Sequence, residues 1–541
     1  MAQAKTLDSC LSQHLAGRRA DARIETMFTT AKLNEKYGHT KPGVAGRRHL
    51  NGVTASLLAF ILCAVGSHIS TCTLHAQARP GIKTDRAVYL EPRLPAPPGA
   101  GGKFNDPVFE TQIMRATDAR ECPAPGCGTW YSQWPTFNSD NTRLLIRNGV
   151  NGGMIIKAFD PHTFTLGRTL RTSPTLPGGV ALEWQGATWS RDDPDLIYVH
   201  VNYYNPHSPA TGMKLYTYRP STNVFTLLKD FAPELAPGQP DYLFEMHVAQ
   251  DGRDDIFTFM QNRVGSVNNP LYFIVWDRLR DKVLYHLSNE ATQLRGNHNY
   301  DLNSASPDKS GRYIVFSHNK TEPNSARHEV LDLQRNGWQT IYWTGADDAP
   351  SHGDVGTGTT TGRGNFSGGF NLRSLSNVHK STILFDNKDA HGILDWTNDQ
   401  HTSLYADDES WVLLGLYDDP AETGTETGAF EDEVMQIAMD GSQRIRRLFH
   451  HRSHIDNLSD TTGYWAIPKP TISRDGRFIA FTSNWGKSGR YDLFIAKIDP
   501  APRLSGLSQT QPSAPLGLVR QRRVTQARPA SRPPRTENQL R

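Results

Sequence analysis

The chain has 541 residues, 37% of them hydrophobic and 45 of them glycine, an ordinary composition for a folded globular protein. This composition excludes a mainly disordered, collagen-like or multi-span membrane protein, and the length is sufficient to bury a substantial core. The net charge of +3 combines two basic ends, +6 over residues 1–79 and +7 over residues 502–541, with an acidic body of −10 that does not favour nucleic-acid binding.

The first 78 residues carry the parts of an export signal. Arg47 and Arg48 precede an uncharged apolar run of 14 residues, 53–66, which is followed by Ala76-Gln77-Ala78. A basic flank, a short apolar core and a small-residue site are typical of a secretory signal peptide, and the run is shorter than the ~20 residues of a membrane span. We expect cleavage after Ala78 and a periplasmic or secreted protein, with a retained, membrane-anchoring signal as the alternative.

Residues 79–104 are expected to form a linker, and the stretch 108–115 (VFETQIMR) indicates a lone strand ahead of the first repeat. Of five cysteines, three fall in the leader, and Cys122 and Cys127 flank a Pro-Ala-Pro-Gly sequence. Two cysteines five positions apart in an exported chain predict a small disulfide loop, with two free thiols as the alternative.

From residue 105 to residue 501 the chain repeats one pattern, a short strand, a turn with Asp or Gly, and further short strands. The clearest copy is the turn Ser473-Arg474-Asp475-Gly476 with the strands 477–482 (RFIAFT) and 491–498 (YDLFIAKI). Turn positions recur at 140, 192, 251, 308, 407 and 475, with intervals of 52, 59, 57, 99 and 68 residues. The interval of 99 fits one degenerate unit over about residues 351–386, which makes seven units in all.

Seven units of short strands at this spacing are typical of β-propeller blades. The last unit shows only three strands, so we expect the lone strand at 108–115 to complete it and to close the ring, which hides sheet edges. The predicted fold is therefore an all-β, seven-bladed β-propeller over residues 105–501. Residues 502–541, rich in Pro, Ser, Gln and Arg, are expected to form a disordered basic tail.

The turn motif followed by an aromatic-rich strand, clearest from Ile472 to Ile498, resembles the TolB-like and WD-like propellers. In this architecture the chain is also similar to the oligogalacturonate lyases, which are exported seven-bladed propellers. The resemblance is specific for the fold, because the motif is structural and the same architecture supports unrelated activities.

The innermost strand of each blade lines the central channel of a propeller, so residues just before each turn are expected to converge on one axis. These positions hold Gln133, Trp134, Gln185, His247, His298, His352, Gln400, His401 and Lys469. Four consecutive units each offer a histidine, and convergent imidazoles can bind a divalent metal or transfer protons. A polar channel lining, satisfied by water and backbone, is the alternative.

The resemblance implies a specific ligand set, since oligogalacturonate lyases bind a divalent metal through three histidines and one glutamine. Here His298, His352, His401 and Gln400 would supply that set for Mn, Ca or Zn, and His247 is a further candidate. Such a metal would neutralise a uronate carboxylate while a base, Lys469 or a histidine, removes the adjacent proton.

Aromatic residues near the expected channel mouth could stack on sugar rings, although tryptophans also pack between blades. The predicted ligand-binding residues are Gln133, Trp134, Gln185 and Trp465, and Trp184 and Trp485 are expected near the same mouth. The run from His450 to His454 is rich in ligand atoms, but adjacent side chains on a strand point apart, so we expect a loop of exposed polar groups there.

We therefore expect an exported recognition module that binds a glycan or a peptide at the channel mouth, because no complete catalytic motif is present. One alternative is a metal-dependent polysaccharide lyase that acts by β-elimination. A second alternative is a protein-assembly scaffold of the TolB type, with a protein partner on one face of the propeller. A nucleic acid is not expected as a partner, and a membrane is expected only through an uncleaved leader.

Overall fold

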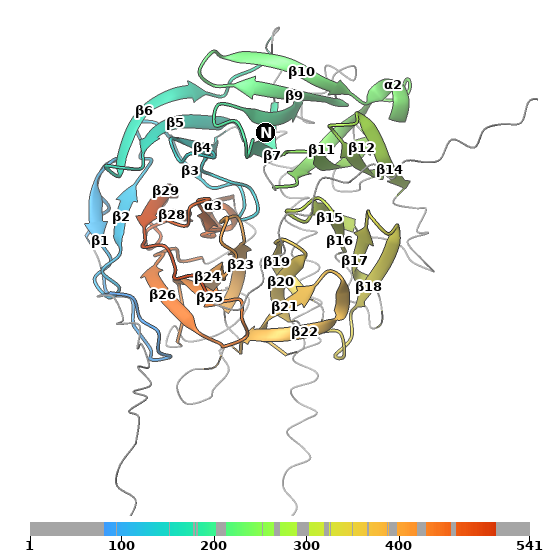
Figure 1. Cartoon of the computed structure of the whole chain (residues 1–541). Coiled ribbons are helices and arrows are strands. Elements are labelled where there is room, and N and C mark those ends of the chain that lie inside the picture. Colours follow the sequence, from blue (N-terminus) through green and yellow to red (C-terminus); the bar gives the residue numbers. More distant parts are fainter. Residues whose placement is uncertain are drawn as a thin grey trace, which may run out of the picture. The chain divides into compact units, whose positions relative to one another are not determined.

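Seven antiparallel sheets follow one another along the chain around a central axis, so the fold is an all-β, seven-bladed propeller, as the repeat predicts (Figure 1). None of the helices in the described part of the chain is long and apolar enough to cross a membrane. The predicted leader lies outside the described residues. The computed structural model describes residues 81–504, with gaps at 94, 151, 177–178, 180–181, 202–211, 251–252, 264–270, 289–301, 319–323, 325, 349, 365–366, 387, 389–397, 419–428 and 456–460.

Each of the first six blades is a four-stranded sheet that starts at the axis and ends at the rim. Blade 1 contains β3 (Cys127–Gly128), β4 (Arg143–Asn148), β5 (Met154–Asp160) and β6 (Thr165–Thr172). Blade 2 contains β7 (Leu182–Trp189), β8 (Ile197–Val201), β9 (Lys214–Arg219) and β10 (Val224–Asp230). Blade 3, which follows the short helix α2 (Ala232–Leu235), contains β11 (Asp241–Val248), β12 (Ile256–Arg263), β13 (Tyr272–Asp277) and β14 (Lys282–Ser288).

The next three blades have the same order of strands. Blade 4 contains β15 (Leu302–Pro307), β16 (Tyr313–His318), β17 (Ala326–Asp332) and β18 (Gly337–Tyr342). Blade 5, the degenerate unit of the sequence, contains β19 (Pro350–Val355), β20 (Thr359–Gly364), β21 (Phe370–Ser374) and β22 (Asn377–Phe385). Blade 6 contains β23 (Asn398–Ser403), β24 (Trp411–Asp418), β25 (Glu433–Ala438) and β26 (Ile445–His450).

Blade 7 is completed from the other end of the propeller sequence. The helix α3 (Thr461–Ala466) leads into β27 (Thr471–Ile472), β28 (Phe478–Ser483) and β29 (Asp492–Lys497). The N-terminal strand β2 (Gln112–Arg115) pairs antiparallel with β29, with Gln112 opposite Lys497, and confirms the predicted closure. A fifth strand, β1 (Lys103–Asn105), pairs with β2 and begins inside the stretch that the sequence predicted to be a linker.

A separate apolar core fills each interface between neighbouring blades. Between blades 7 and 1, for example, Phe478 and Ile495 pack with Phe137 and Ile146, and corresponding clusters occupy the six other interfaces. The middle strands are covered on both faces and are therefore apolar over most of their length, as in β28 (FIAFTS), where every residue is buried. Because a single blade cannot bury both of its faces, the ring as a whole forms the stable unit.

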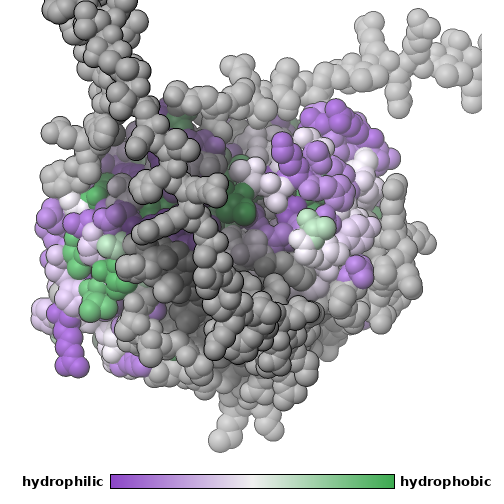
Figure 2. Space-filling view, turned by 90° about the horizontal axis from the view of Figure 1, so that it is seen from below, coloured by the Kyte–Doolittle hydropathy of each residue, from purple (hydrophilic) through white to green (hydrophobic). Residues whose placement is uncertain are grey.

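The outer strands are more polar and more exposed, as the burial of β6 and β22 shows. In Figure 2, hydrophilic residues predominate on the described part of the face seen from below, and a smaller hydrophobic patch lies at the left of the view.

The turn residues of the repeat connect the innermost strand to the next one. In blade 7, the Ser473 hydroxyl accepts hydrogen bonds from the amides of Arg477 and Phe478 and donates one to Asp475. Gly476 has a φ of +70°, which glycine adopts without a steric cost. These short-range bonds explain why the turn is visible in the sequence.

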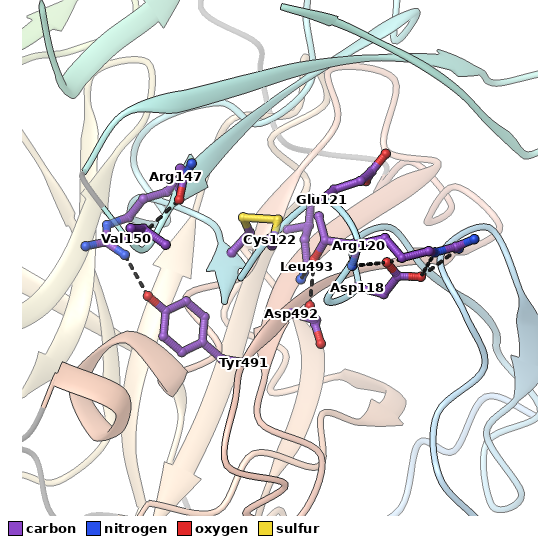
Figure 3. The surroundings of a disulfide bond; sticks show 12 residues. Asp118, Arg120, Glu121, Cys122, Arg147, Val150, Tyr491, Asp492 and Leu493 are labelled. Carbon is purple, nitrogen blue, oxygen red and sulfur yellow. Dashed lines mark hydrogen bonds and ion pairs between the residues drawn. A yellow bond between two sulfur atoms is a disulfide. The ribbon is translucent and has the colours of Figure 1, made fainter. Parts of the chain in front are cut away.

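The predicted disulfide between Cys122 and Cys127 is present, beside the junction of blades 1 and 7 (Figure 3). The Cys127 amide donates a hydrogen bond of 3.1 Å to the carbonyl of Tyr491, and Arg490 donates one of 2.9 Å to the carbonyl of Cys122. Arg147 of blade 1 donates a further hydrogen bond of 2.9 Å to the Tyr491 hydroxyl (Figure 3). The loop therefore fastens blade 1 to blade 7 where the ring closes.

Candidate functional site

The innermost strand of blade 1 is interrupted at the centre of the propeller. β3 ends at Gly128, and the chain rejoins the sheet only where Phe137 bridges to Leu144. Residues 129–135, which we call the crossing segment, lie between these two points. The sequence of this segment, TWYSQWP, contains three aromatic residues.

The crossing segment reaches blades on the other side of the axis. Trp134 Nε1 donates a hydrogen bond of 2.9 Å to the carbonyl of Met246 in β11. Gln133 Nε2 donates one of 3.2 Å to the carbonyl of Gly353 in β19. Since blades 3 and 5 are not neighbours of blade 1, these bonds run through the middle of the ring.

One end of the channel collects aromatic rings and cations, and we call Tyr131, Arg147, Tyr464, Trp465 and Lys469 the aromatic end. The Arg147 guanidinium lies 3.4 Å from the centre of the Trp465 ring. The Lys469 ammonium lies 3.9 Å from the ring centre of Tyr464, 4.6 Å from that of Trp465 and 5.3 Å from that of Tyr131. The three rings are half-buried, so parts of them face solvent.

Two of the predicted channel histidines lie against the aromatic end. The rings of His352 and His401 stack with their centres 5.1 Å apart and their planes 11° apart. His401 also contacts Tyr131 edge to face, at 4.7 Å between ring centres. His401 is fully buried, whereas His352 is half-buried.

Two residues at this end have strained backbones. His352 and Lys469 have φ values of +45° and +38°, in the left-handed region that residues with a side chain rarely adopt. Each such residue costs of order 1–3 kcal/mol, and strained residues gather at functional sites.

Two buried polar atoms in the crossing segment have no hydrogen-bond partner among the described residues, Trp130 Nε1 and Ser132 Oγ. Trp130 is 7% exposed and Ser132 is fully buried. A polar atom left in this state costs about 1–3 kcal/mol, so a hydrogen bond to either atom, for example from an ordered water, would be stabilising.

A small cavity lies on the axis below the crossing segment. Its volume is about 30 Å³, room for one or two water-sized groups. Trp134, His247, Lys309, Asp354 and Tyr405 contribute to its lining. The His247 ring stacks on Trp134 at 5.1 Å, and its Nε2 is buried with no partner among the described residues.

Two titratable groups of the cavity lining, His247 and Asp354, have pKa values shifted in favour of their neutral forms. Burial lowers the pKa of His247 to about 4. Burial raises the pKa of Asp354 to about 6, although the amides of Leu404 and Val355 donate to its carboxylate and oppose this shift. Both changes have the same cause, because a low-dielectric interior disfavours the charged form of either group.

The opposite end of the channel, where the innermost strands finish, is closed by charges. We call Arg191, Lys309, Asp407, Glu409 and Arg474 the ionic end. Arg191 of blade 2 pairs with Asp407 of blade 6, and Arg474 of blade 7 donates to the same carboxylate at 3.1 Å. Lys309 of blade 4 pairs with Glu409 at 2.8 Å. These ion pairs span the axis.

Most of the predicted site residues lie near the channel axis, and the others fall outside the described residues. Gln133, Trp134 and His247 lie around the cavity, and His352, His401, Trp465 and Lys469 lie at or against the aromatic end. His298 lies outside the described residues. The side chains of Trp184 and Gln185 are outside them too, although both residues belong to β7.

The described residues of the predicted metal set do not converge on one point. An imidazole nitrogen binds a metal in the plane of its ring, so the two nearly parallel rings of His352 and His401 do not aim at a common ion. Gln400 precedes His401 in β23, and adjacent side chains on a strand point to opposite faces. These three side chains are therefore not arranged to hold one metal ion together.

The surroundings of Lys469 suit a cation better than a base. Aromatic faces stabilise an ammonium group, and three rings surround this one. Its Nζ also donates a hydrogen bond of 2.8 Å to the carbonyl of Tyr464. A general base needs the neutral amine, so this environment supports a binding role.

Two expectations about neighbouring residues are wrong. Trp485 packs against Phe104 and Phe494 of the outer part of blade 7, away from the channel mouth. The run that begins at His450 is not an exposed loop, because residues 450–453 are at most 3% exposed and His454 is half-buried. A segment of the chain that precedes β1 covers this run.

Comparisons with known proteins bear on the fold. No protein-family model and no curated protein sequence matches this chain. Among solved structures, it is similar to oligogalacturonate lyase from Vibrio parahaemolyticus, with a TM-score of 0.50 and 11% identity over 74% of this chain and 99% of that chain. Weaker similarity links it to the mitotic checkpoint complex (TM-score 0.37, 9% identity, 76% and 100% covered) and to a post-proline cleaving enzyme from Rickettsia typhi (TM-score 0.37, 11% identity, 65% and 49% covered).

The protein is thus an all-β, seven-bladed β-propeller. Its architecture is similar to that of the oligogalacturonate lyase. At 11% identity this similarity shows the fold alone, and the two weaker ones carry no further argument.

Sequence reasoning missed part of the site. Tyr131 and Arg147 are central to the aromatic end. The dense aromatic sequence of the crossing segment was an available signal for Tyr131. Arg147 is an ordinary polar residue of a strand, and only the folded ring shows what it faces.

Proposed function

We propose that this protein is a recognition module that binds a glycan at the aromatic end of its channel. The observation that carries the proposal is the crossing segment. It brings the half-buried ring of Tyr131, and two polar atoms without a partner among the described residues, close to the half-buried rings of Tyr464 and Trp465. Sugar rings present apolar C–H faces and many hydroxyl groups, so a glycan site combines aromatic surface with a few fixed polar groups. Tyr131, Tyr464 and Trp465 offer the first, and Ser132 and Gln133 offer the second.

The cations extend this proposal to the charge of the ligand. Arg147 and Lys469 are held among the rings, where they would pair with acidic groups of a bound glycan. A peptide ligand is the other outcome of the binding test. The predicted export signal, with its apolar core at residues 53–66, favours a location outside the cytoplasm, where the glycans of a cell surface are accessible.

The test is a glycan and peptide array with the purified protein, followed by calorimetry on the best ligand. Trp465→Ala and Tyr131→Ala should each weaken binding about tenfold, the effect of losing one well-packed aromatic contact. Trp485→Ala is the matched control, since it removes a half-buried tryptophan of blade 7 that lies elsewhere. Absence of binding to every glycan and peptide would contradict the proposal, as would equal effects of all three variants.

A second candidate is a polysaccharide lyase, and the similarity of the fold to oligogalacturonate lyase is the observation that favours it. It predicts a rise in ultraviolet absorbance from an unsaturated product when the protein is mixed with polyuronate. A chelator and the His352→Ala substitution should each abolish this activity. Cleavage that survives both treatments would contradict the metal-dependent form of this candidate.

A further inference from the structure

The segment that covers the run from His450 to His454 consists of residues 82–93 and 95–98, which we call the strap. It extends along blade 6 and onto blade 7, and the Arg447 amide donates a hydrogen bond of 2.9 Å to the carbonyl of Lys83. Body side chains face the strap carbonyls, namely Arg447 at Asp85 and Ala87, His450 at Tyr89, Arg452 at Pro92, Trp485 at Pro95 and Arg115 at Pro98. Half of the described strap residues are exposed and none is fully buried, so polar contacts hold this segment more than an apolar core does.

His450 joins the strap to the body through its two ring nitrogens. Nε2 lies 2.9 Å from the carbonyl of Tyr89 in the strap, and Nδ1 lies 3.7 Å from the carboxylate of Asp106. The side chain is buried against the Phe109 ring. A neutral imidazole carries one N–H, whereas an imidazolium carries two and can serve both neighbours.

His454, like His450, has one ring nitrogen near the strap and the other near a carboxylate of the body. Its Nε2 lies 3.5 Å from Glu91 of the strap, and its Nδ1 lies 3.6 Å from Asp432 of blade 6. The three side chains bring one ligand atom each within 4.8 Å of one another. However, the two carboxylates flank different nitrogens of one ring, and Arg452 lies 3.1 Å from Glu91. A protonated imidazole between two carboxylates fits this geometry better than a metal ion.

We propose that His450 and His454 form a proton-dependent latch, which fastens the strap to blade 6 when both imidazoles are protonated and releases it when they lose their protons. Release uncovers Arg447 and the outer edge of β26. The device differs from the proposed glycan site, because none of its residues belongs to the aromatic end.

The charges around the latch favour the protonated state. Burial opposes the imidazolium form of His450, but the carboxylates of Asp106 and Glu433 and the carbonyl of Tyr89 outweigh it and raise the pKa of His450. For Glu91, burial is likewise outweighed by His454, Arg452 and His450, which lower its pKa. Among the described residues, Arg447 and Arg452 are the cations that face this group, and each has a carboxylate partner, Glu433 and Glu91 respectively.

The direction of the pH effect follows from the raised pKa of His450. Its contribution to docking is complete below the ordinary imidazole pKa of about 6.5 and is lost as the pH rises through the higher value in the docked state. Loss of the protons should lower the equilibrium constant for docking of the strap about tenfold for each unit by which docking raises the pKa of an imidazole.

The test is amide hydrogen exchange of the full chain from about pH 5.5 to about pH 9, with labelling times adjusted for intrinsic exchange. The Arg447 amide reports on the strap, because it bonds to Lys83, and the Ser473 amide, bonded to Phe478, reports on general unfolding. Protection of Arg447 should fall by tenfold or more as the pH rises, while protection of Ser473 stays constant.

The variants separate the latch from other causes. His450→Gln and His454→Gln keep a donor without a titration, so each should flatten the pH dependence at Arg447, and Glu91→Gln should do so from the strap side. His162→Gln, an exposed histidine of blade 1, should leave the profile unchanged. The proposal is contradicted if the protection of the wild-type Arg447 amide does not change with pH, or if the variant with both His450→Gln and His454→Gln shows the same pH dependence as the wild type. A change in this protection on adding zinc or a chelator would also contradict it.

Discussion

The two ends of the channel are built from the same repeat and differ in what surrounds their charged groups. At the ionic end, charges from blades 2, 4, 6 and 7 pair across the axis. At the aromatic end, half-buried rings surround cations, the backbone is strained, and two polar atoms of the crossing segment have no partner among the described residues. Ion pairs occupy the first end of the channel, and the second end is the one at which we propose that a ligand binds.

Glu409→Gln should have the largest effect, because it removes the carboxylate that pairs with the Lys309 ammonium, a buried charge. We expect the free energy of unfolding, measured with urea, to fall by about 4 kcal/mol. Lys309→Met is the matched variant and should cost less, since it removes the charge and leaves Glu409 with the amide of Thr357. Equal losses would show that the ionic end does not depend on this pair.

His247, between the two ends, should make the protein acid-sensitive. Its pKa of about 4 lies below that of an unfolded histidine, so the unfolded chain binds the additional proton and stability falls as the pH drops from about 6.5 to about 4. The contribution is about 3 kcal/mol at full extent. The contribution is isolated by measuring the free energy of unfolding of His247→Phe and of the wild type at both pH values. If the difference between the two proteins is the same at both pH values, the prediction is wrong.

The disulfide anchors the chain just ahead of the crossing segment. Replacing both Cys122 and Cys127 by Ser should lower the free energy of unfolding by about 2 kcal/mol, the value for such a short loop. Thermal unfolding with and without a reductant gives the same comparison on the unaltered protein. A midpoint that does not respond to reduction would show that the loop adds nothing to the closure of the ring.

Lys469→Met should have the smallest effect, since it keeps the hydrocarbon stem inside the aromatic end and removes only the ammonium. We expect a loss of about 1 kcal/mol, the size of a cation–π interaction. Lys282→Met, at an exposed position of β14, is the control and should change stability little. A gain in stability would indicate that the rings do not stabilise the charge.

The fold was predictable because its signals are local. The bonds of Ser473 and Asp475 lie within five residues of each other in the chain, and the buried middle strands show as apolar runs. Even the closing strand could be assigned, because three strands in the last unit left one place empty and VFETQIMR was available to fill it.

The site was predictable only by position along the repeat. That rule found His352 and His401, whose rings do meet, but it could not give their stacked orientation. The bond from Trp134 to Met246 joins residues far apart in the sequence, and no local pattern encodes it. The run from His450 was expected to be exposed for a related reason, since only the folded protein shows the strap that covers it.

Closure by β2 has a consequence for the order of events during synthesis. Each of the first six sheets is contiguous in the chain and can form as it leaves the ribosome, but Gln112 must wait for Lys497, near the far end of the described chain. Until then Ile113 and Met114 belong to a nascent strand with an open edge. A chain that stops short of Lys497 therefore carries a strand that seeks a partner in another molecule, so premature termination leads toward aggregation.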